Sequence, residues 1–515
     1  MEQHPLLDSL QLTILEGRRF LECPPLKQVV SQFLQLFASG GVQGTTSNAK
    51  AGMIRDLITI LEAMDCQWLF GSCHLDATPT LLRDLVVALS HYAAPPQQEP
   101  EGGGFPSDAP SYTAVASQVA DVSLVFHSIV AKVELARGLE RPNAAAVGSV
   151  LRQVAGPVYL FAITHVAERL WTTPRTRSMA QELLDGLLRA SDCQSVPEFL
   201  RGAYEGKEGW FAAVMQCLKP GLTKETWQHN PATKHVFSWT LQQVTRPWLG
   251  HHLEKVLPPS LLLSDDYRVE NKILGVQCLH HIIQNVPAAD LCQFNRVQVV
   301  YHALSNHLYS KEAQLMQVVL LCLLDLLPIV EKALQRLPHD SQLAAPSTEV
   351  LRLVLTHMES EHQLSLRRVY ARNLPAFVER LGIQVARHLK RLQQVIVGYL
   401  EVSDRPEEAA RLATLETLKR IIQHAWPRMT CRLAVLLKAL LRMMWDVATD
   451  RSSTPEPVKA ELLQRATECL LLLDRSSHGQ VKVLLQGVYR NCQDVNLKEC
   501  LRKVQEEPVK NLISS

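Results

Sequence analysis

The stretch LAVLLKALLRMM, Leu433–Met444, decides the fold class of this chain. Its apolar residues return at the three- and four-residue spacing of one helix face, at Leu433, Leu436, Leu437, Leu440, Leu441 and Met444. The same spacing recurs at Phe377, Leu381, Val385, Leu392, Val395, Ile396 and Tyr399, and at Leu412, Leu415, Leu418 and Ile422. We find no sustained alternation of apolar and polar residues, which a half-buried strand requires. The pattern therefore predicts an all-α protein with almost no sheet.

The predicted helices come in consecutive pairs joined by short turns. The pairs are 267–285 with 290–308, 312–326 with 328–337, and 348–358 with 362–382, followed by a long helix over 376–401. Short polar caps predict helix starts at Ser264–Asp266, Ser347–Thr348 and Thr454–Glu456. Serial helix pairs without strands are typical of an α-solenoid of HEAT or armadillo type. A single irregular helical bundle is the competing architecture.

The chain divides by composition into four expected regions. A helical region over 1–92 precedes a Pro-, Gly- and acid-rich linker over 93–111, which we expect to be disordered. A helical repeat region over 112–259 and a HEAT-like C-terminal domain over 260–515 follow, with their join near Pro258 and Pro259. A chain of 515 residues exceeds the roughly 250–300 residues of a single core, which also favours several cores or an elongated stack.

Charge and hydropathy exclude several classes of partner. The chain holds 53 Lys and Arg against 51 Asp and Glu, a net charge of +2, which provides no general attraction to nucleic acid or anionic lipid. Its most apolar run, 318–327, contains Asp325 and is shorter than the roughly 20 residues that span a bilayer. The N-terminus has no secretory signal pattern. We expect a cytoplasmic and nuclear protein that is not secreted and binds neither nucleic acid nor a membrane.

The search for catalytic and ligand-binding motifs is negative. Residues 40–46, GGVQGTT, lack the Lys of a phosphate-binding loop, and the adjacent histidines at 251–252 and 280–281 diverge on a helix. His302 and His307 diverge in the same way. The 12 cysteines are scattered, and several lie in apolar runs, as Cys278, Cys322 and Cys431 do, which is typical of buried, reduced thiols. We expect no catalytic residue, cofactor or metal; an enzyme that uses Cys66 or Cys73 remains the alternative.

Basic residues are the candidates for partner binding. Two predicted ridges consist of Arg428, Arg432, Lys438 and Arg442 after Pro427, and of Arg380, Arg387 and Arg391 along the 376–401 helix. A third group, Arg367, Arg368 and Arg372, precedes Pro375, and Arg268 lies in an earlier turn. Such ridges can bind an acidic partner surface. The alternative is that they form the solvated outer face of solenoid helices, with acids of neighbouring helices nearby, or cap helix ends.

Several strings resemble one family. Residues 265–281 (DDYRVENKILGVQCLHH), 370–377 (YARNLPAF), 387–392 (RHLKRL) and 397–401 (VGYLE) resemble the Tel-two-interacting protein two (Tti-two) family, in its vertebrate form. The resemblance covers roughly 260–505, and the N-terminal half matches only in general character. None of these strings is a catalytic signature. They identify a family without locating an active site.

The resemblance implies a function that the residues alone do not. The family forms an α-solenoid subunit of the TTT co-chaperone complex, with the Tel-two and Tti-one proteins. With heat-shock-protein-ninety and the RuvB-like ATPases, that complex matures phosphatidylinositol-3-kinase-related kinases of the mTOR, ATM, ATR and DNA-PK type. It thereby supports growth signalling and the DNA-damage response. The resemblance implies a non-enzymatic scaffold that grips Tti-one, with the C-terminal half as the contact surface. Another HEAT-type scaffold, such as a transport adaptor, is the alternative.

Overall fold

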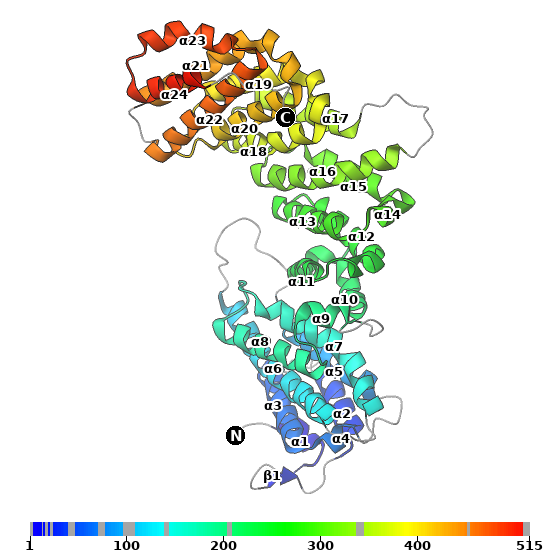
Figure 1. Cartoon of the computed structure of the whole chain (residues 1–515). Coiled ribbons are helices and arrows are strands. Elements are labelled where there is room, and N and C mark those ends of the chain that lie inside the picture. Colours follow the sequence, from blue (N-terminus) through cyan, green and yellow to red (C-terminus); the bar gives the residue numbers. More distant parts are fainter. Residues whose placement is uncertain are drawn as a thin grey trace. The chain divides into compact units, whose positions relative to one another are not determined.

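The computed structural model describes residues 4–12, 14–15, 19–20, 24–39, 47–70, 78–95, 109–138, 144–202, 209–335, 345–450 and 454–507. The chain forms two compact units, Met1–Pro259 and Ser260–Ser515, and in both of them the described residues are almost entirely helical (Figure 1). The predicted loop 40–46 and residues 96–108 of the predicted linker lie outside the described residues.

The N-terminal unit contains the first half of the helices. Their bounds are α1 (Pro5–Ser9), α2 (Leu26–Ser39), α3 (Ser47–Ala63), α4 (Cys66–Phe70), α5 (Thr78–Tyr92), α6 (Ala109–Gly138), α7 (Ala144–Val166), α8 (Pro174–Ala190), α9 (Val196–Arg201), α10 (Phe211–Leu218), η1 (Lys219–Leu222), η2 (Trp227–His229), α11 (Pro231–Gln242), η3 (Trp248–His252) and the start of α12 (Leu253–Ser264). The described strands are the two-residue β1 (Ile14–Leu15) and β2 (Arg19–Phe20), which pair antiparallel.

Two rows of helices build the N-terminal unit. One row runs α1, α3, α6, α8 and the other runs α2, α5, α7, each helix contacting the next in its row. Between the rows, α6 and α8 both contact α7, whose Val154, Val158 and Ala162 are fully buried. Because α6 begins at Ala109, the last three residues of the predicted linker are helical. Apolar residues on the inner faces of both rows therefore form a core that no single helix could form.

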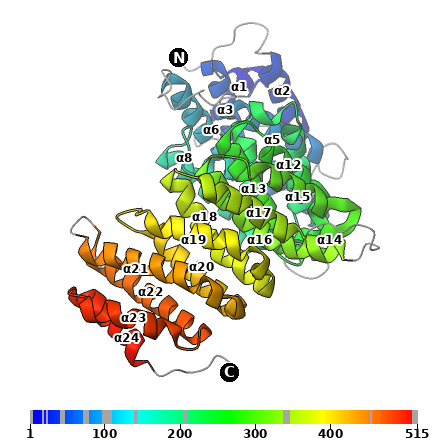
Figure 2. The same cartoon turned by 90° about the horizontal axis from the view of Figure 1, so that it is seen from above.

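The C-terminal unit repeats this arrangement. Its elements are α13 (Val269–Asn285), α14 (Ala288–Cys292), η4 (Gln293–Asn295), α15 (Arg296–His307), α16 (Ala313–Leu334), α17 (Pro346–Ser360), α18 (Leu364–Leu381), η5 (Gly382–His388), α19 (Leu389–Glu401), α20 (Ala409–Ala425), η6 (Trp426–Arg428), η7 (Thr430–Arg432), α21 (Leu433–Thr449), α22 (Glu456–Ser476), α23 (Gln480–Asn491) and α24 (Val495–Glu506). One row runs α13, α16, α18, α20, α22, α24 and the other runs α17, α19, α21 (Figure 2). The solenoid of helix pairs expected from the sequence is confirmed.

Two predicted helix boundaries are wrong. The predicted pair 312–326 and 328–337 is a single helix, α16, which continues through Pro328. Leu326, Leu327 and Val330 are fully buried on either side of that proline, so tertiary packing outweighs the roughly 3 kcal/mol cost of an interior proline. The predicted 376–401 helix is broken, because α18 ends at Leu381 and Gly382 has a φ of 51°.

The predicted polar caps are not the caps that the structure uses. Ser264 ends α12 and its hydroxyl bonds Nε2 of His307 at 2.9 Å, Ser347 lies inside α17, and α22 has Pro455 at its N-cap. Side-chain capping occurs instead at α8, where Thr173 and Thr176 form a reciprocal capping box. The helices without such caps depend on buried apolar faces.

Three described helices are long and apolar enough to cross a membrane: Tyr112–Arg137, Ala145–Val166 and Ala313–Leu334. The expectation that the 318–327 run is too short is wrong by this measure, because that run belongs to a 22-residue helix. In the structure these helices face others: α16 contacts α13, α15 and α18, and half of its apolar window is buried. Burial on several sides accounts for its composition, since a helix that is apolar all round needs neighbours all round.

Candidate partner-binding surface

Four of the predicted basic residues connect one helix to another within the C-terminal unit. Arg380 of α18 lies 3.3 Å from Glu331 of α16, and Arg391 of α19 lies 2.9 Å from Glu359 of α17. Two contacts join α21 and the turn before it to α19. Arg432 donates to Gln393 at 2.8 Å, and Arg442 of α21 lies 2.9 Å from Glu401 of α19. The hydrogen bond from Arg391 lowers the pKa of Glu359. These arginines therefore form a ladder of contacts between successive helices.

This ladder corrects both predicted ridges. Arg380, Arg387 and Arg391 do not share one helix, because the break at Gly382 places them in α18, η5 and α19. Of the second ridge, only Lys438 and Arg442 lie on α21, since Arg428 and Arg432 precede it in 3-10 turns. Helical spacing predicts a shared face only along an unbroken helix.

Sequence reasoning missed three further contacts of the ladder. Glu379 of α18 accepts hydrogen bonds from Arg420 at 2.9 Å and from His424 at 3.2 Å, both on α20. Lys419 of α20 lies 3.0 Å from Glu468 of α22. The hydrogen bond from His424 is the main reason that the pKa of Glu379 is lowered, and Lys419 does the same for Glu468. The spacing of acids along α18 and α22 does not reveal these partners, because they lie more than 40 residues away.

Two predicted arginines at the start of α18 bind neighbouring parts of the chain: Arg367 binds the end of α17 and α19, and Arg368 binds the segment between α19 and α20. Arg367 is buried, and its guanidinium donates to the carbonyls of Glu361 and Gly398, each at 3.2 Å. Arg368 donates to the buried carboxylate of Asp404 at 2.9 Å and lies 3.0 Å from Glu407. Asp404 in turn accepts the backbone N–H of Ala410, at the start of α20. The structure places Arg367 inside the fold, where a partner would have little access to it, and leaves Arg368 half-buried.

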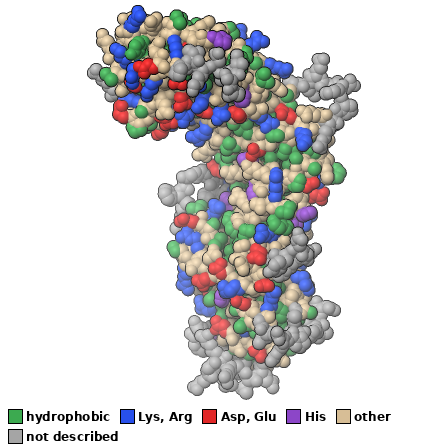
Figure 3. All heavy atoms as spheres, in the orientation of Figure 1, with side chains coloured by type: hydrophobic (Ala, Val, Ile, Leu, Met, Phe, Trp, Pro, Cys, Tyr) green, Lys and Arg blue, Asp and Glu red, His purple; other side chains and the backbone are tan. Residues whose placement is uncertain are grey.

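Four of the five remaining candidates are exposed, and Arg268 is half-buried. The side chains of Arg372, Arg387, Arg428 and Lys438 have neither an ion pair nor a hydrogen bond within the part of the chain that the structure describes. Arg268 stacks beside Tyr267, whose hydroxyl lies 2.8 Å from its Nε. Lys and Arg side chains are interspersed with acids on the visible face of the C-terminal unit, and hydrophobic side chains lie between them (Figure 3). Electrostatic attraction alone therefore does not single out one patch.

Exposed apolar residues on α21 single out one face. Val435 and Trp445 are 45% and 51% exposed, and they share a helix face with Lys438 and Arg442 at spacings of three, four and three residues. We call these four residues the α21 face. The opposite side carries the buried stripe of the predicted core, in which Leu437 is 6% exposed. The sequence does contain a signal for Trp445, which lies off the apolar stripe and seven residues after Lys438. An exposed Trp beside Arg is the composition of an interface hot spot.

A second apolar face occurs on α23, near the C-terminus. Val483, Leu484 and Val488 are 74%, 54% and 40% exposed, and Val495 at the start of α24 is 80% exposed. The end of a solenoid normally presents a polar outer face to water. Exposed apolar groups on both α21 and α23 mark this end of the unit as a candidate protein-binding region.

The histidines and cysteines that the sequence analysis weighed as metal or catalytic candidates contact other residues of the fold. Among the described residues, no group of three His, Cys, Asp or Glu side chains comes together to hold a metal ion. His280 lies 2.8 Å from Asp325, and His252 packs against the ring of Phe211. Cys66 donates weakly to the carbonyl of Lys132, while Cys73 lies outside the described residues.

The prediction of buried cysteines is confirmed at two of its three named positions. Cys278 and Cys322 are buried, and burial raises the pKa of the Cys322 thiol. Cys431 is exposed, because it lies in η7 before α21 begins. The prediction is wrong at that position because the apolar stripe starts two residues later, at Leu433.

Comparison with known proteins identifies relatives along most of the chain. The model of the Tti2 family matches residues 213–405. TELO2-interacting protein 2 from Homo sapiens is 54% identical over 461 residues, which are 89% of this chain and 89% of that protein. Its Rattus norvegicus counterpart is 51% identical, over 94% of this chain and 93% of that protein. Yeast importin-β (Kap95p) matches with a TM-score of 0.44 at 15% identity, over 92% of this chain and 57% of that one.

These alignments extend the resemblance well beyond the expected 260–505, into the N-terminal unit. The N-terminal half therefore matches in sequence as well as in general character. With 54% identity over most of both chains, the chain belongs to the Tti2 family.

Proposed function

We propose that this chain is a non-enzymatic scaffold subunit of the TTT co-chaperone complex, assembled with the Tel-two and Tti-one proteins. The relatives that match most of the chain are named for interaction with TELO2. Through that complex, heat-shock-protein-ninety and the RuvB-like ATPases, the chain supports the stability of mTOR-, ATM-, ATR- and DNA-PK-type kinases. We place this activity in the cytoplasm and nucleus.

The observation that carries the proposal is the α21 face together with the helix ladder behind it. Arg380 and Arg391 pair with acids on neighbouring helices, and the buried apolar faces of the helices hold the stack together. A rigid stack presents its exposed side chains without a large ordering cost on binding. Trp445 and Val435 provide apolar contact area, and Lys438 provides an unpaired charge within the described residues. This chemistry fits an amphipathic helix with acidic side chains, and we propose that Tti-one supplies it.

Arg442 belongs to this face even though it pairs with Glu401. Its side chain is 62% exposed, and a surface ion pair contributes only about 0.2–1 kcal/mol. A partner carboxylate can therefore replace or share that pair at little cost.

The test is affinity purification of the full-length chain at native expression level, followed by mass spectrometry. We expect Tti-one and Tel-two to co-purify with the unmodified chain. The double variant Lys438→Glu/Trp445→Ala should reduce Tti-one recovery by at least tenfold, because loss of a hot-spot aromatic costs about 2 kcal/mol or more.

The matched control reverses one exposed lysine and truncates one exposed apolar residue in the other unit, Lys224→Glu/Leu124→Ala. It should leave recovery unchanged. Equal recovery with both double variants would move the contact away from the α21 face. A chain that recovers neither partner would contradict the proposed function itself.

A further inference from the structure

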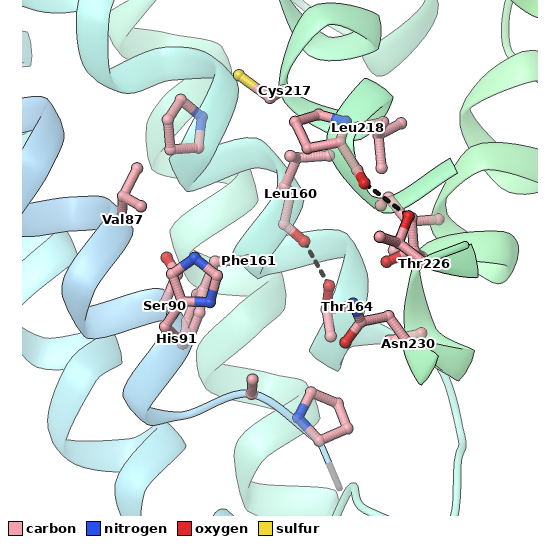
Figure 4. A pocket seen from close by; sticks show the side chains of 18 of the residues that line it. Val87, Ser90, His91, Leu160, Phe161, Thr164, Cys217, Leu218, Thr226 and Asn230 are labelled. Carbon is pink, nitrogen blue, oxygen red and sulfur yellow. Dashed lines mark hydrogen bonds between the residues drawn. The ribbon is translucent and has the colours of Figure 1, made fainter. Parts of the chain in front are cut away.

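A cavity of about 650 Å³ lies within the N-terminal unit, well away in sequence from the α21 face. Four helices provide its apolar lining, which includes Val87 of α5, Leu160 and Phe161 of α7, Leu218 of α10 and Val236 of α11 (Figure 4). Ligand sites in proteins are typically concave, mostly apolar and roughly 300–1,000 Å³ in volume. The size and lining of this cavity match that description.

Three hydroxyl groups of the lining already have acceptors within the fold. Ser90 donates to the carbonyl of Val86, and Thr164 donates to the carbonyl of Leu160, both at 2.7 Å. Thr226 donates to the carbonyl of Pro220 at 2.7 Å (Figure 4). The protons of these hydroxyl groups therefore do not call for a ligand.

The side-chain amide of Asn230 is not used in this way. Asn230 lies at the N-cap of α11 and lines the cavity, yet its side chain forms no hydrogen bond with another described residue. An asparagine at an N-cap usually accepts a backbone N–H from the first turn of its helix. Here the N–H of Thr233 binds the backbone carbonyl of Asn230 instead, at 3.0 Å. The helix that Asn230 begins therefore leaves the amide available.

A molecule in the cavity can reach this amide. Figure 4 shows the Asn230 side chain extending from the start of α11 toward Thr164 of α7. Asn230 is half-buried, and neither of its polar side-chain atoms is among the enclosed polar atoms that lack a partner. An asparagine amide offers an acceptor, Oδ1, beside a donor, Nδ2. A ligand that matches it needs a donor beside an acceptor.

Charge around the cavity is sparse. Arg83 is the one Lys or Arg side chain of its described lining, and it is 54% exposed and 3.6 Å from Asp84. No acidic residue belongs to the described lining. A charged ligand would lose its hydration without gaining a buried counter-ion.

We propose that this cavity binds an uncharged, mainly apolar small molecule that carries an N–H donor beside a C=O acceptor, as a lactam or a carboxamide does, and that pairs through both groups with the side-chain amide of Asn230. The cavity and the α21 face belong to different units, so this activity does not depend on the TTT role.

The test uses isoquinolin-1(2H)-one and its N-methyl derivative as probes, because they share an apolar ring system and differ in the N–H donor. Their dissociation constants are measured by calorimetry or ligand-observed NMR for the full chain and for Asn230→Leu. The lactam should bind the unmodified chain about threefold to tenfold more tightly than its N-methyl derivative. The two probes should bind Asn230→Leu equally.

Asn230→Leu is suited to this comparison because leucine is close to asparagine in size and the replaced amide forms no hydrogen bond within the described residues. Its thermal unfolding should therefore match that of the unmodified chain. A preference for the lactam that persists in Asn230→Leu, or equal binding of both probes to the unmodified chain, would overturn the assignment of Asn230 and the proposal with it.

A second pair of variants tests the cavity without altering a buried residue. Val87 lines the cavity and is 36% exposed, so Val87→Trp adds bulk there without disturbing the core. It should weaken binding of both probes at least tenfold. Leu124→Trp places the same side chain at an exposed position outside the lining and should have no effect. Binding that survives Val87→Trp, that falls equally with Leu124→Trp, or that is absent from the unmodified chain would overturn the site.

Discussion

The guanidinium of Arg367 lies over the ring of Tyr399, with Cζ 3.8 Å from the ring centroid. Both side chains are buried, and Arg367 also donates to two backbone carbonyls. Arg367 thus connects the start of α18 to the end of α19. Tyr399, on which it lies, belongs to the apolar core predicted from the sequence. These contacts explain how a charged side chain is tolerated inside the solenoid. The two carbonyls and the tyrosine ring take the place of the water that would otherwise solvate the guanidinium.

Arg367→Ala should therefore destabilise the C-terminal unit by about 2–4 kcal/mol, since it removes a desolvated cation–π contact and two charged hydrogen bonds. Urea unfolding and hydrogen exchange of α19 measure the loss. Arg372→Ala, five residues later and exposed, should change stability by less than about 0.5 kcal/mol. Similar losses in both variants would contradict a structural role specific to Arg367.

Gly275→Ala should strongly destabilise the same unit. An added Cβ would lie 2.1 Å from the backbone N of Ser264 and 2.6 Å from its Cα, so the end of α12 would have to move. We expect a cost of about 3 kcal/mol, at the upper end for overpacking. Gly398→Ala is the matched control, because nothing lies within 4 Å of its Cβ position. That change should be neutral or stabilise by about 0.5–1 kcal/mol. Thermal unfolding of both variants decides between these outcomes.

Leu437→Asp and Arg442→Glu separate the two sides of α21. Leu437 is 6% exposed, so an aspartate there buries an unpaired charge and should cost several kcal/mol. Arg442→Glu loses only the surface pair with Glu401, about 0.2–1 kcal/mol, and should fold normally. Circular dichroism against urea measures both. If Leu437→Asp folds as well as the unmodified chain, the buried side of α21 has been placed incorrectly.

The N-terminal unit should lose stability in acid. The pKa of His165 is lowered from 6.5 to about 3, so below pH 6.5 the unfolded chain binds a proton that the folded chain does not. The contribution of His165 to stability therefore falls as the pH decreases, by about 1.4 kcal/mol per pH unit below pH 6.5, or about 2 kcal/mol between pH 7 and pH 5. Hydrogen exchange of α7 at the two pH values, corrected for intrinsic rates, measures the difference.

His165→Phe should remove the share of His165, about 2 kcal/mol between pH 7 and pH 5. A share of similar size should remain from His252 in the same unit, because burial lowers its pKa to about 4, which is also below pH 5. A dependence of equal size in the variant would show that other groups cause it.

Much of the core was predictable residue by residue. All seven members of the stripe from Phe377 to Tyr399 are buried, even though they occupy α18, η5 and α19 and do not share one helix. The helical spacing of apolar residues still identifies the buried residues across this break, because both flanking helices face the same core. The break itself was not predictable from spacing, since Gly398, also within this stretch, lies inside a helix while Gly382 ends one.

The candidate surface was only partly predictable. Lys438 and Arg442 were placed correctly on the side of α21 away from its core. Both lie on one unbroken helix, so their positions in the sequence set the directions of their side chains. The pairing of Arg380 with Glu331 or of Arg420 with Glu379 was not accessible, because each partner lies on another helix.

The sequence by itself determined the helices, their buried stripes and the membership of the family, because periodicity and identity are local properties of the chain. Only the tertiary structure decided which arginines are internal connectors, which are exposed, and where the cavity beside Asn230 lies. Those features depend on distances between residues on different helices, such as Glu379 and His424 or Val87 and Leu218. The angle of a side chain about its own helix axis carries no information about such distances.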